Sequence, residues 1–160
     1  MTTLIGLNTS AIDSTLNTGK TFAIGNRHQD HSGNTWAYVF ASVAFTLGDC
    51  VAIKSNYHAA PMTDALSKTT GEVGFAQVAV TIDNYAWVMT NGRPTYVRVA
   101  IDCEPHVPLY ITGTAGVLDD ATLSSMIAGV QINTSATAAG AYAGRLSFPS
   151  VRWGASLSQI

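Results

Sequence analysis

The chain has 160 residues and a mass of 16.8 kDa, the size of one ordinary domain, so separate cofactor and substrate domains are not expected. Only 11% of its residues are Asp, Glu, Lys or Arg, against about 25% in a typical soluble domain, while 47% are apolar. This balance excludes a disordered chain. The net charge of -2, without a basic stripe that could face phosphates, excludes nucleic acid as an ordinary partner.

Residues 1–25 differ in composition from the rest of the chain. Thr, Asn, Ser and Gly recur in them, and their apolar residues are scattered singly, which predicts an extended arm. Residues 26–160 then form a single β-rich domain. We expect the arm to contact a neighbouring subunit or another protein, although an arm packed on its own domain would have the same composition. The candidate contact residues are the apolar side chains of the arm and one tryptophan near the carboxyl end: Leu4, Ile5, Leu7, Ile12, Leu16 and Trp153.

No targeting or membrane-spanning segment is expected. The longest apolar stretch, residues 36–45, is about half the roughly 20 residues that a spanning helix needs. The amino terminus has its first basic residue at Lys20 and lacks the apolar core of a signal peptide. We therefore expect a chain that is made in the cytoplasm and has no membrane partner.

From Thr35 onwards the hydrophobic period is two. Trp36, Tyr38 and Phe40 share one face of a predicted strand, and short strands follow at 50–53 and at 59–62, the second at a sheet edge because Pro61 cannot donate a ladder hydrogen bond. Further strands are predicted at 73–80, 85–89 and 95–101. Residues 91–92 are Asn-Gly, which predicts a hairpin between the last two, with Val97, Val99 and Ile101 on its buried face.

In the last third of the chain, apolar and polar residues alternate less regularly. A strand is predicted at 107–111, and alternation returns at 145–148. Residues 119–129 fit either one helix or a loop that leads into a strand at 127–132. Short strands with turn signals about every ten residues predict a mainly β fold: a small antiparallel β-barrel or sandwich with an extended N-terminal arm and at most one short helix.

Residues able to carry chemistry form no strong motif. His28 and His31 have HxxH spacing, and Cys103 and His106 have CxxH spacing; a shared zinc site is possible, but solvated loop histidines explain the pattern as well. No nucleophile elbow, phosphate-binding loop or HExxH sequence is present. We expect no metal, no cofactor and no enzymatic activity.

Ordinary structural roles explain the two cysteines and the adjacent aspartates. A single Cys50–Cys103 disulfide is an alternative to two half-buried free thiols in strands, which a cytoplasmic compartment favours. Asp119 and Asp120 are adjacent, so in a strand they point to opposite faces and at a helix start they act as caps.

The tryptophans allow two interpretations. Trp36 and Trp87 sit in alternating strands, which favours burial in the core over a sugar-binding surface. Trp153 lies outside a clear strand and is the best single candidate for an intermolecular contact.

Seven short segments, in this order along the chain, resemble the head-decoration, or capsid cement, proteins of tailed bacteriophages. They are GDCVAI (48–53), AAPMT (59–63), VGFAQ (73–77), YAWVMT (85–90), LYIT (109–112), TAGVLDD (114–120) and IAGV (127–130). The resemblance covers residues 27–132. Each segment is short, and their order carries more weight than any one of them.

The resemblance implies a small β-barrel-like domain on the outer surface of an assembled capsid. Such proteins often form trimers and clamp neighbouring major capsid subunits, and no catalytic residue comes with the likeness. The implied partners are the major capsid protein and copies of this chain as a homotrimer. Two other functions stay open: a glycan- or receptor-binding module displayed on the virion, and a minor structural protein of the tail or neck.

Overall fold

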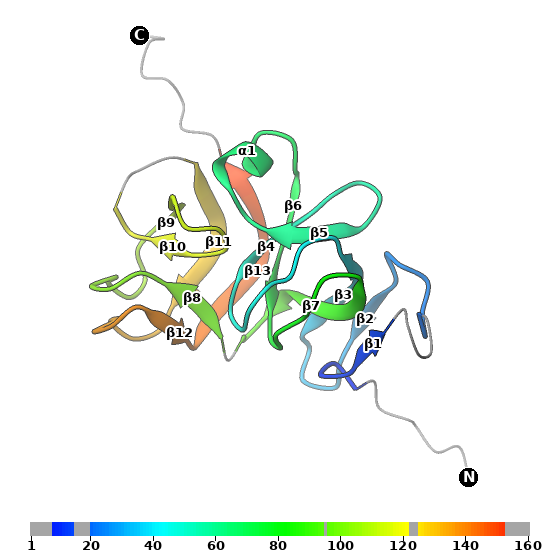
Figure 1. Cartoon of the computed structure of the whole chain (residues 1–160). Helices are drawn as coiled ribbons and strands as arrows, with labels where there is room; N and C mark the ends of the chain where they lie inside the picture. The colour runs from blue at the N-terminus through cyan, green and yellow to red at the C-terminus, as the bar shows by residue number, and fades with distance from the viewer. Residues whose placement is uncertain (1–7, 15–19, 95, 122–124, 153–160) are drawn as a thin grey trace, which may run out of the picture.

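The computed structural model describes residues 8–14, 20–94, 96–121 and 125–152, which form short strands and one short helix (Figure 1). The mainly β prediction and the single short helix are confirmed. In chain order the elements are β1 Ile12–Ser14, β2 Arg27–Gln29, β3 Thr35–Ala41, β4 Cys50–Ile53, β5 His58–Pro61, α1 Asp64–Ser67, β6 Glu72–Ala76, β7 Asn84–Gly92, β8 Val97–Val99, β9 Leu109–Ile111, β10 Leu118–Asp119, β11 Met126–Ile132, β12 Gly140–Tyr142 and β13 Gly144–Arg152.

Five strands close into a barrel. β3 pairs with β7, β7 with β6, β6 with β4, and β4 with β5, and the barrel closes because β5 also pairs with β3. All of these pairs are antiparallel except β3–β5. Closure removes the free edges that an open sheet would present to other chains. Of the two architectures that the sequence allowed, the structure shows the barrel.

Small side chains fill the barrel interior. The inner cluster takes Ala37, Val39 and Ala41 from β3, and its other members on the strands are also Ala, Val or Ile. A barrel of so few strands is narrow, so alanine and valine fit where larger groups would not. The large residues that alternate with them, including Trp36 and Tyr38, therefore lie on the outer side of the wall.

The outer side of the barrel wall is buried as well. Six further strands extend from β7, in the order β13, β11, β9, β10, β8 and β12, and lie beside the barrel (Figure 1), while β1 pairs with β7 and β2 pairs with β3. One large cluster joins Trp36, Trp87 and Met89 of the wall to residues such as Leu109 and Ile127 of these strands. The core placement of Trp36 and Trp87 is confirmed, at 5% and 3% exposure.

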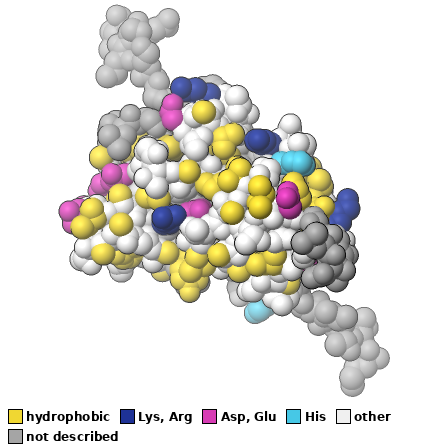
Figure 2. All heavy atoms as spheres, in the orientation of Figure 1, with side chains coloured by type: hydrophobic (Ala, Val, Ile, Leu, Met, Phe, Trp, Pro, Cys, Tyr) yellow, Lys and Arg dark blue, Asp and Glu magenta, His cyan; other side chains and the backbone are white. Residues whose placement is uncertain are grey.

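Burial on both faces of the wall accounts for much of the low charge, because such strands are apolar on both sides. The surface itself is also poor in charge. On the face drawn in Figure 2, charged side chains are isolated spots among hydrophobic and uncharged polar atoms.

The predicted hairpin at Asn91 and Gly92 is wrong. Both residues belong to β7, where Asn91 pairs with Ser147 and Gly92 pairs with Leu146. The chain then leaves the barrel and enters the outer strands, where β8 pairs with β10 and β12 instead of β7. The positive φ of Gly92, 123°, serves a close approach rather than a tight turn, since a Cβ there would lie 2.1 Å from Asn34 Oδ1.

Other predictions are corrected in part. Val97 and Val99 are fully buried as expected, but Ile101 lies beyond the end of β8 and is 56% exposed. β5 is not an edge strand, because it lies between β4 and β3. Pro61 pairs only with β4, because the pairing of β5 with β3 involves only His58 and Ala59. The N–H that proline lacks is therefore not needed for the pairing with β3, and Pro61 is tolerated.

The helix alternative for residues 119–129 is wrong for the part that is described, which forms the end of β10 and the start of β11. The helix α1 lies instead at Asp64–Ser67, where the Thr63 side chain caps it by accepting a hydrogen bond from Leu66 N. Among the described residues, no helix is both long and apolar enough to cross a membrane.

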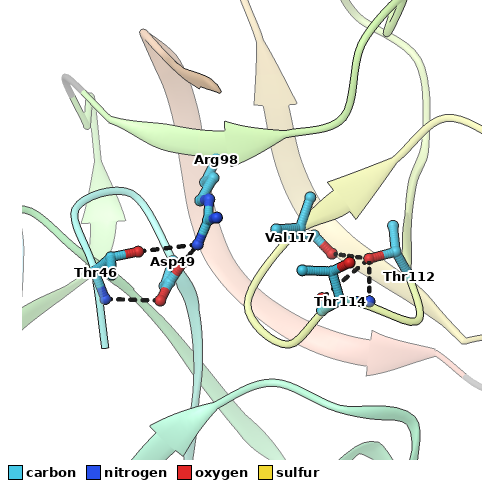
Figure 3. A network of polar contacts seen from close by, with 6 residues as sticks. All are labelled: Thr46, Asp49, Arg98, Thr112, Thr114 and Val117. Carbon is cyan, nitrogen blue, oxygen red and sulfur yellow. Dashed lines mark hydrogen bonds and ion pairs between the residues drawn. The ribbon is translucent and has the colours of Figure 1, made fainter. Parts of the chain in front are cut away.

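The turn at residues 46–50 connects the two halves of the molecule, the barrel and the outer strands beside it (Figure 3). Asp49, at 2% exposure, accepts hydrogen bonds from Thr46 N at 2.7 Å and from Arg98 of β8 at 2.9 Å. The Arg98 guanidinium also reaches Thr46 Oγ1, at 3.0 Å. Gly116 packs against the carboxyl group so closely that a Cβ there would lie 2.6 Å from Asp49 Cγ.

We predict that Asp49→Ala lowers the free energy of unfolding by about 2–3 kcal/mol, because it leaves a partly buried guanidinium and a backbone N–H without their acceptor. Urea unfolding measures this change. The matched control is Lys68→Ala, which breaks the exposed Asp64–Lys68 pair and should cost less than about 0.5 kcal/mol. Equal losses in the two variants would contradict the proposed role of Asp49.

Candidate binding surface along strand β13

The contact residues predicted from the sequence are not brought together in the described part of the chain. Ile12 lies in β1, pairs with Ala86 of β7 and is 40% exposed. The other five, Leu4, Ile5, Leu7, Leu16 and Trp153, lie outside the described residues.

The described part of the predicted arm lies on its own barrel. Asp13 of β1 accepts hydrogen bonds from the Tyr38 hydroxyl and from Thr21 N. Burial raises the pKa of Asp13, but these hydrogen bonds outweigh it, so the net pKa lies below the usual 3.8. The ionised carboxylate therefore holds β1 against β3.

Both cysteines are free and buried. They are more buried than the half-buried thiols expected, and Cys103 lies in the loop between β8 and β9 rather than in a strand. Burial and the nearby Asp49 charge raise the pKa of Cys50, and burial with the charges of Asp119 and Asp120 raises the pKa of Cys103 to about 11. Both thiols stay protonated at neutral pH, which makes them poor nucleophiles.

The possible metal ligands that the structure brings together differ from the cysteine and histidine set that the sequence suggested for zinc. Among the described residues, the potential ligand atoms that lie within 4.8 Å of one another belong to Cys103, Asp119 and Asp120, with no histidine among them. Asp119 accepts a hydrogen bond from the Cys103 thiol, and Asp120 accepts one from Glu104 N at 2.9 Å. The two aspartates thus tie the turn before β9 to β10. His28 packs its ring against Trp87, with centroids 6.3 Å apart.

The most unusual surface residue is Phe148 in β13. It is 64% exposed, more than the other large exposed hydrophobic residues of the described chain. Its φ of 44° is a left-handed conformation that bulky L-residues rarely adopt. A strained, exposed aromatic side chain is typical of sites that contact another molecule.

A bulge in β13 produces this exposure. Ala128 pairs with Ser150 and Val130 pairs with Leu146, so only Gly129 of β11 faces the three residues 147–149 of β13. Gly129 is required here, because a Cβ at its position would lie 2.5 Å from the carbonyl oxygen of Ser147. The extra residues push Phe148 outward while Pro149 is buried.

Three hollows of the surface are lined in part by β13. One of about 450 Å³ lies over β11 and includes Pro108, Met126 and Val130. One of about 270 Å³ includes Phe148 with Thr90 and Glu72. The third, of about 690 Å³, is mostly polar and includes Asn34, Arg93 and Arg145. An exposed aromatic side chain at the wall of a hollow can anchor a partner that fills it.

A turn around Asp30 builds one wall of the polar hollow. The Asp30 carboxylate accepts hydrogen bonds from Ser32 N at 2.9 Å, from both the backbone and side-chain nitrogens of Asn34, and from Trp36 Nε1 at 3.0 Å. Burial raises the pKa of Asp30, but these donors outweigh it and the net pKa lies below 3.8. The turn is therefore organised by an ionised carboxylate.

Sequence reasoning missed Phe148. Alternation at residues 145–148 places Phe148 on the same face as the buried Leu146, which predicts a buried side chain. Pro149 was the available signal, because proline within a strand often marks a bulge.

Comparisons with known proteins add no family to this description. No protein-family model matches the chain, and no curated protein sequence matches it.

We predict that Phe148→Gly raises the free energy of unfolding by up to about 1 kcal/mol, because glycine adopts the left-handed conformation without strain. Phe148→Ala is the matched control: it removes the same exposed ring but keeps a Cβ, so it should change stability by less than about 0.5 kcal/mol. Chemical unfolding of both variants measures the difference. A glycine variant no more stable than the alanine variant would show that the backbone at this position is unstrained.

A second prediction concerns acid. The folded pKa of Asp30 lies below its usual value of 3.8, so its ionised form stabilises the fold above pH 3.8 and this contribution is lost as the pH falls through the folded pKa. The difference in unfolding free energy between the wild type and Asp30→Asn should be constant near neutral pH and shrink below 3.8. Urea unfolding over a pH series measures it. Taking the difference cancels the similar titration of Asp13, and a difference that does not depend on pH would contradict the prediction.

Proposed function

We propose that the chain is a structural virion protein that binds the outer surface of a tailed-phage capsid and stabilises it by clamping neighbouring major capsid subunits. The order of the short segments supports this proposal. In the structure these segments include the second half of the 46–50 turn and large parts of β4, β6, β7 and β10, the elements that build the barrel and its junction with the outer strands. The likeness therefore falls on the framework of the fold.

The observation that carries the proposal is the exposed, strained Phe148, which lines one of the hollows along β13. A decoration protein needs a rigid surface with an apolar anchor and few charges to desolvate. Phe148 is held by a strand that pairs with both β11 and β7, so the anchor is part of the framework.

The proposed partners are the major capsid protein and further copies of this chain as a homotrimer. The proposed location is the outer capsid surface, after synthesis in the host cytoplasm. Many symmetric copies turn modest contacts into strong retention, because each bound neighbour raises the effective concentration of the next contact. The protein needs no catalytic step for this function, and we propose that it has none.

Co-sedimentation with capsids of its own phage tests the proposal. The purified chain should bind mature, expanded capsids and not unexpanded precursor shells, since clamping requires the final spacing of the subunits. Phe148→Asp should weaken this binding by at least about tenfold, because it puts a charge at the anchor of the interface.

The matched control is Val43→Asp, which places the same charge at another exposed apolar residue, 49% exposed, in the segment after β3. It should bind nearly as the wild type does. Equal binding to both kinds of shell would overturn the proposal. A virion that carries only a few copies would favour a tail or neck protein, and binding to glycan arrays without binding to capsids would favour a receptor-binding module.

A further inference from the structure

Two arginines of neighbouring strands line the polar hollow of about 690 Å³. Arg93 follows Gly92 at the end of β7, and Arg145 precedes Leu146 near the start of β13; Gly92 and Leu146 are paired residues. Both arginines are exposed. Two like charges on adjacent strands repel each other, so their placement costs stability unless an anion joins them.

Neither arginine takes part in an ion pair within the described residues. The basic groups that do so are Arg27, Lys68 and Arg98. The carboxylate of the turn that forms one wall of the hollow, Asp30, accepts hydrogen bonds on both oxygens from the 32–36 segment and forms no ion pair with either arginine. The positive charge in the hollow is therefore available to a ligand.

The backbone beside Arg93 is fixed before any ligand arrives. Asn34 Oδ1 accepts a hydrogen bond from Arg93 N at 3.0 Å, while Asn34 Nδ2 donates to Asp30 at 2.9 Å. Gly92 permits this arrangement because a side chain at that position would collide with Asn34. Less conformational entropy is lost on binding to a hollow whose walls are already fixed.

An apolar groove adjoins the hollow. Arg145 lines both the polar hollow and the groove of about 450 Å³ that contains Pro108, Met126 and Val130. The ligand that suits both has a negatively charged group close to an apolar side chain. Nucleic acid fits less well, because the groove contains no Phe, Tyr or Trp on which a base could stack and because the chain has a net charge of -2.

We propose that this surface binds an acidic peptide segment of a partner protein, with carboxylate side chains on Arg93 and Arg145 and a neighbouring apolar side chain in the groove. Arginine suits this role, because its planar guanidinium pairs with a carboxylate through two parallel hydrogen bonds. The proposal stands apart from the capsid function, because the isolated chain can be tested with a peptide and no capsid.

The probe is a fluorescein-labelled synthetic peptide of alternating Glu and Leu residues, and fluorescence anisotropy measures its binding. The double variant Arg93→Gln with Arg145→Gln should bind about tenfold more weakly, because two charge-assisted contacts are lost. The double variant Lys20→Gln with Lys54→Gln removes the same charge from exposed positions that do not line the hollow, and it should bind as the wild type does.

Additional variants and competitors test folding, the position of the site and the class of ligand one at a time. Arg93→Lys with Arg145→Lys keeps the charge and should retain part of the affinity, which shows that the loss is not one of folding. An equal loss in the Lys20 and Lys54 variant would overturn the site. Equal binding of a peptide with Gln in place of Glu would overturn the role of the carboxylates, and competition by inorganic tripolyphosphate as strong as by the unlabelled peptide would overturn the assignment to a peptide.

Discussion

The connection between the barrel and the outer strands depends on the hydrogen bonds of the buried Asp49 carboxylate. This carboxylate closes its own turn through Thr46 N and reaches across to Arg98 of β8. The backbone of the same turn bonds to both halves: Ala76 N donates to the Asp49 carbonyl oxygen, and Arg98 N donates to that of Gly48. A buried charge is tolerated only when its hydrogen bonds are complete, so the turn, β6 and β8 must all be in place together.

The second constraint is the width of the barrel. The barrel strands contribute only Ala, Val and Ile to the inner cluster, for example Ala37 and Val39, and Trp36, Tyr38 and Trp87 are buried on the other side of the wall. The strands after β7 and the N-terminal segment supply that cover; Phe22, for example, packs against Tyr38 with ring centroids 5.5 Å apart. A chain whose wall is covered on both sides needs few charges, so a low charge does not by itself require contact with other subunits.

The candidate surface follows from the position of β13. This strand pairs with β11 along most of its length and with β7 at residues 146–147, so it lies where the barrel meets the outer strands. Gly129 lets β13 bulge there, and the bulge turns Phe148 outward. The same strand contributes Arg145 to the polar hollow that Arg93 also lines. An aromatic anchor and a positively charged hollow thus share one rigid support.

The sequence by itself determined the kind of structure. Alternation in the 36–41 segment and the buried valines Val97 and Val99 depend on local periodicity, which a strand expresses wherever it pairs. Tertiary structure decided the partners. Asn91 and Gly92 looked like a hairpin because their local preferences allow one, but in the structure β7 continues through them and pairs there with β13. Phe148 looked buried because alternation assumes unbroken pairing, and only the glycine opposite it, 19 positions away in the chain, permits the bulge that exposes it. Such features depend on contacts between distant segments, which local patterns do not record.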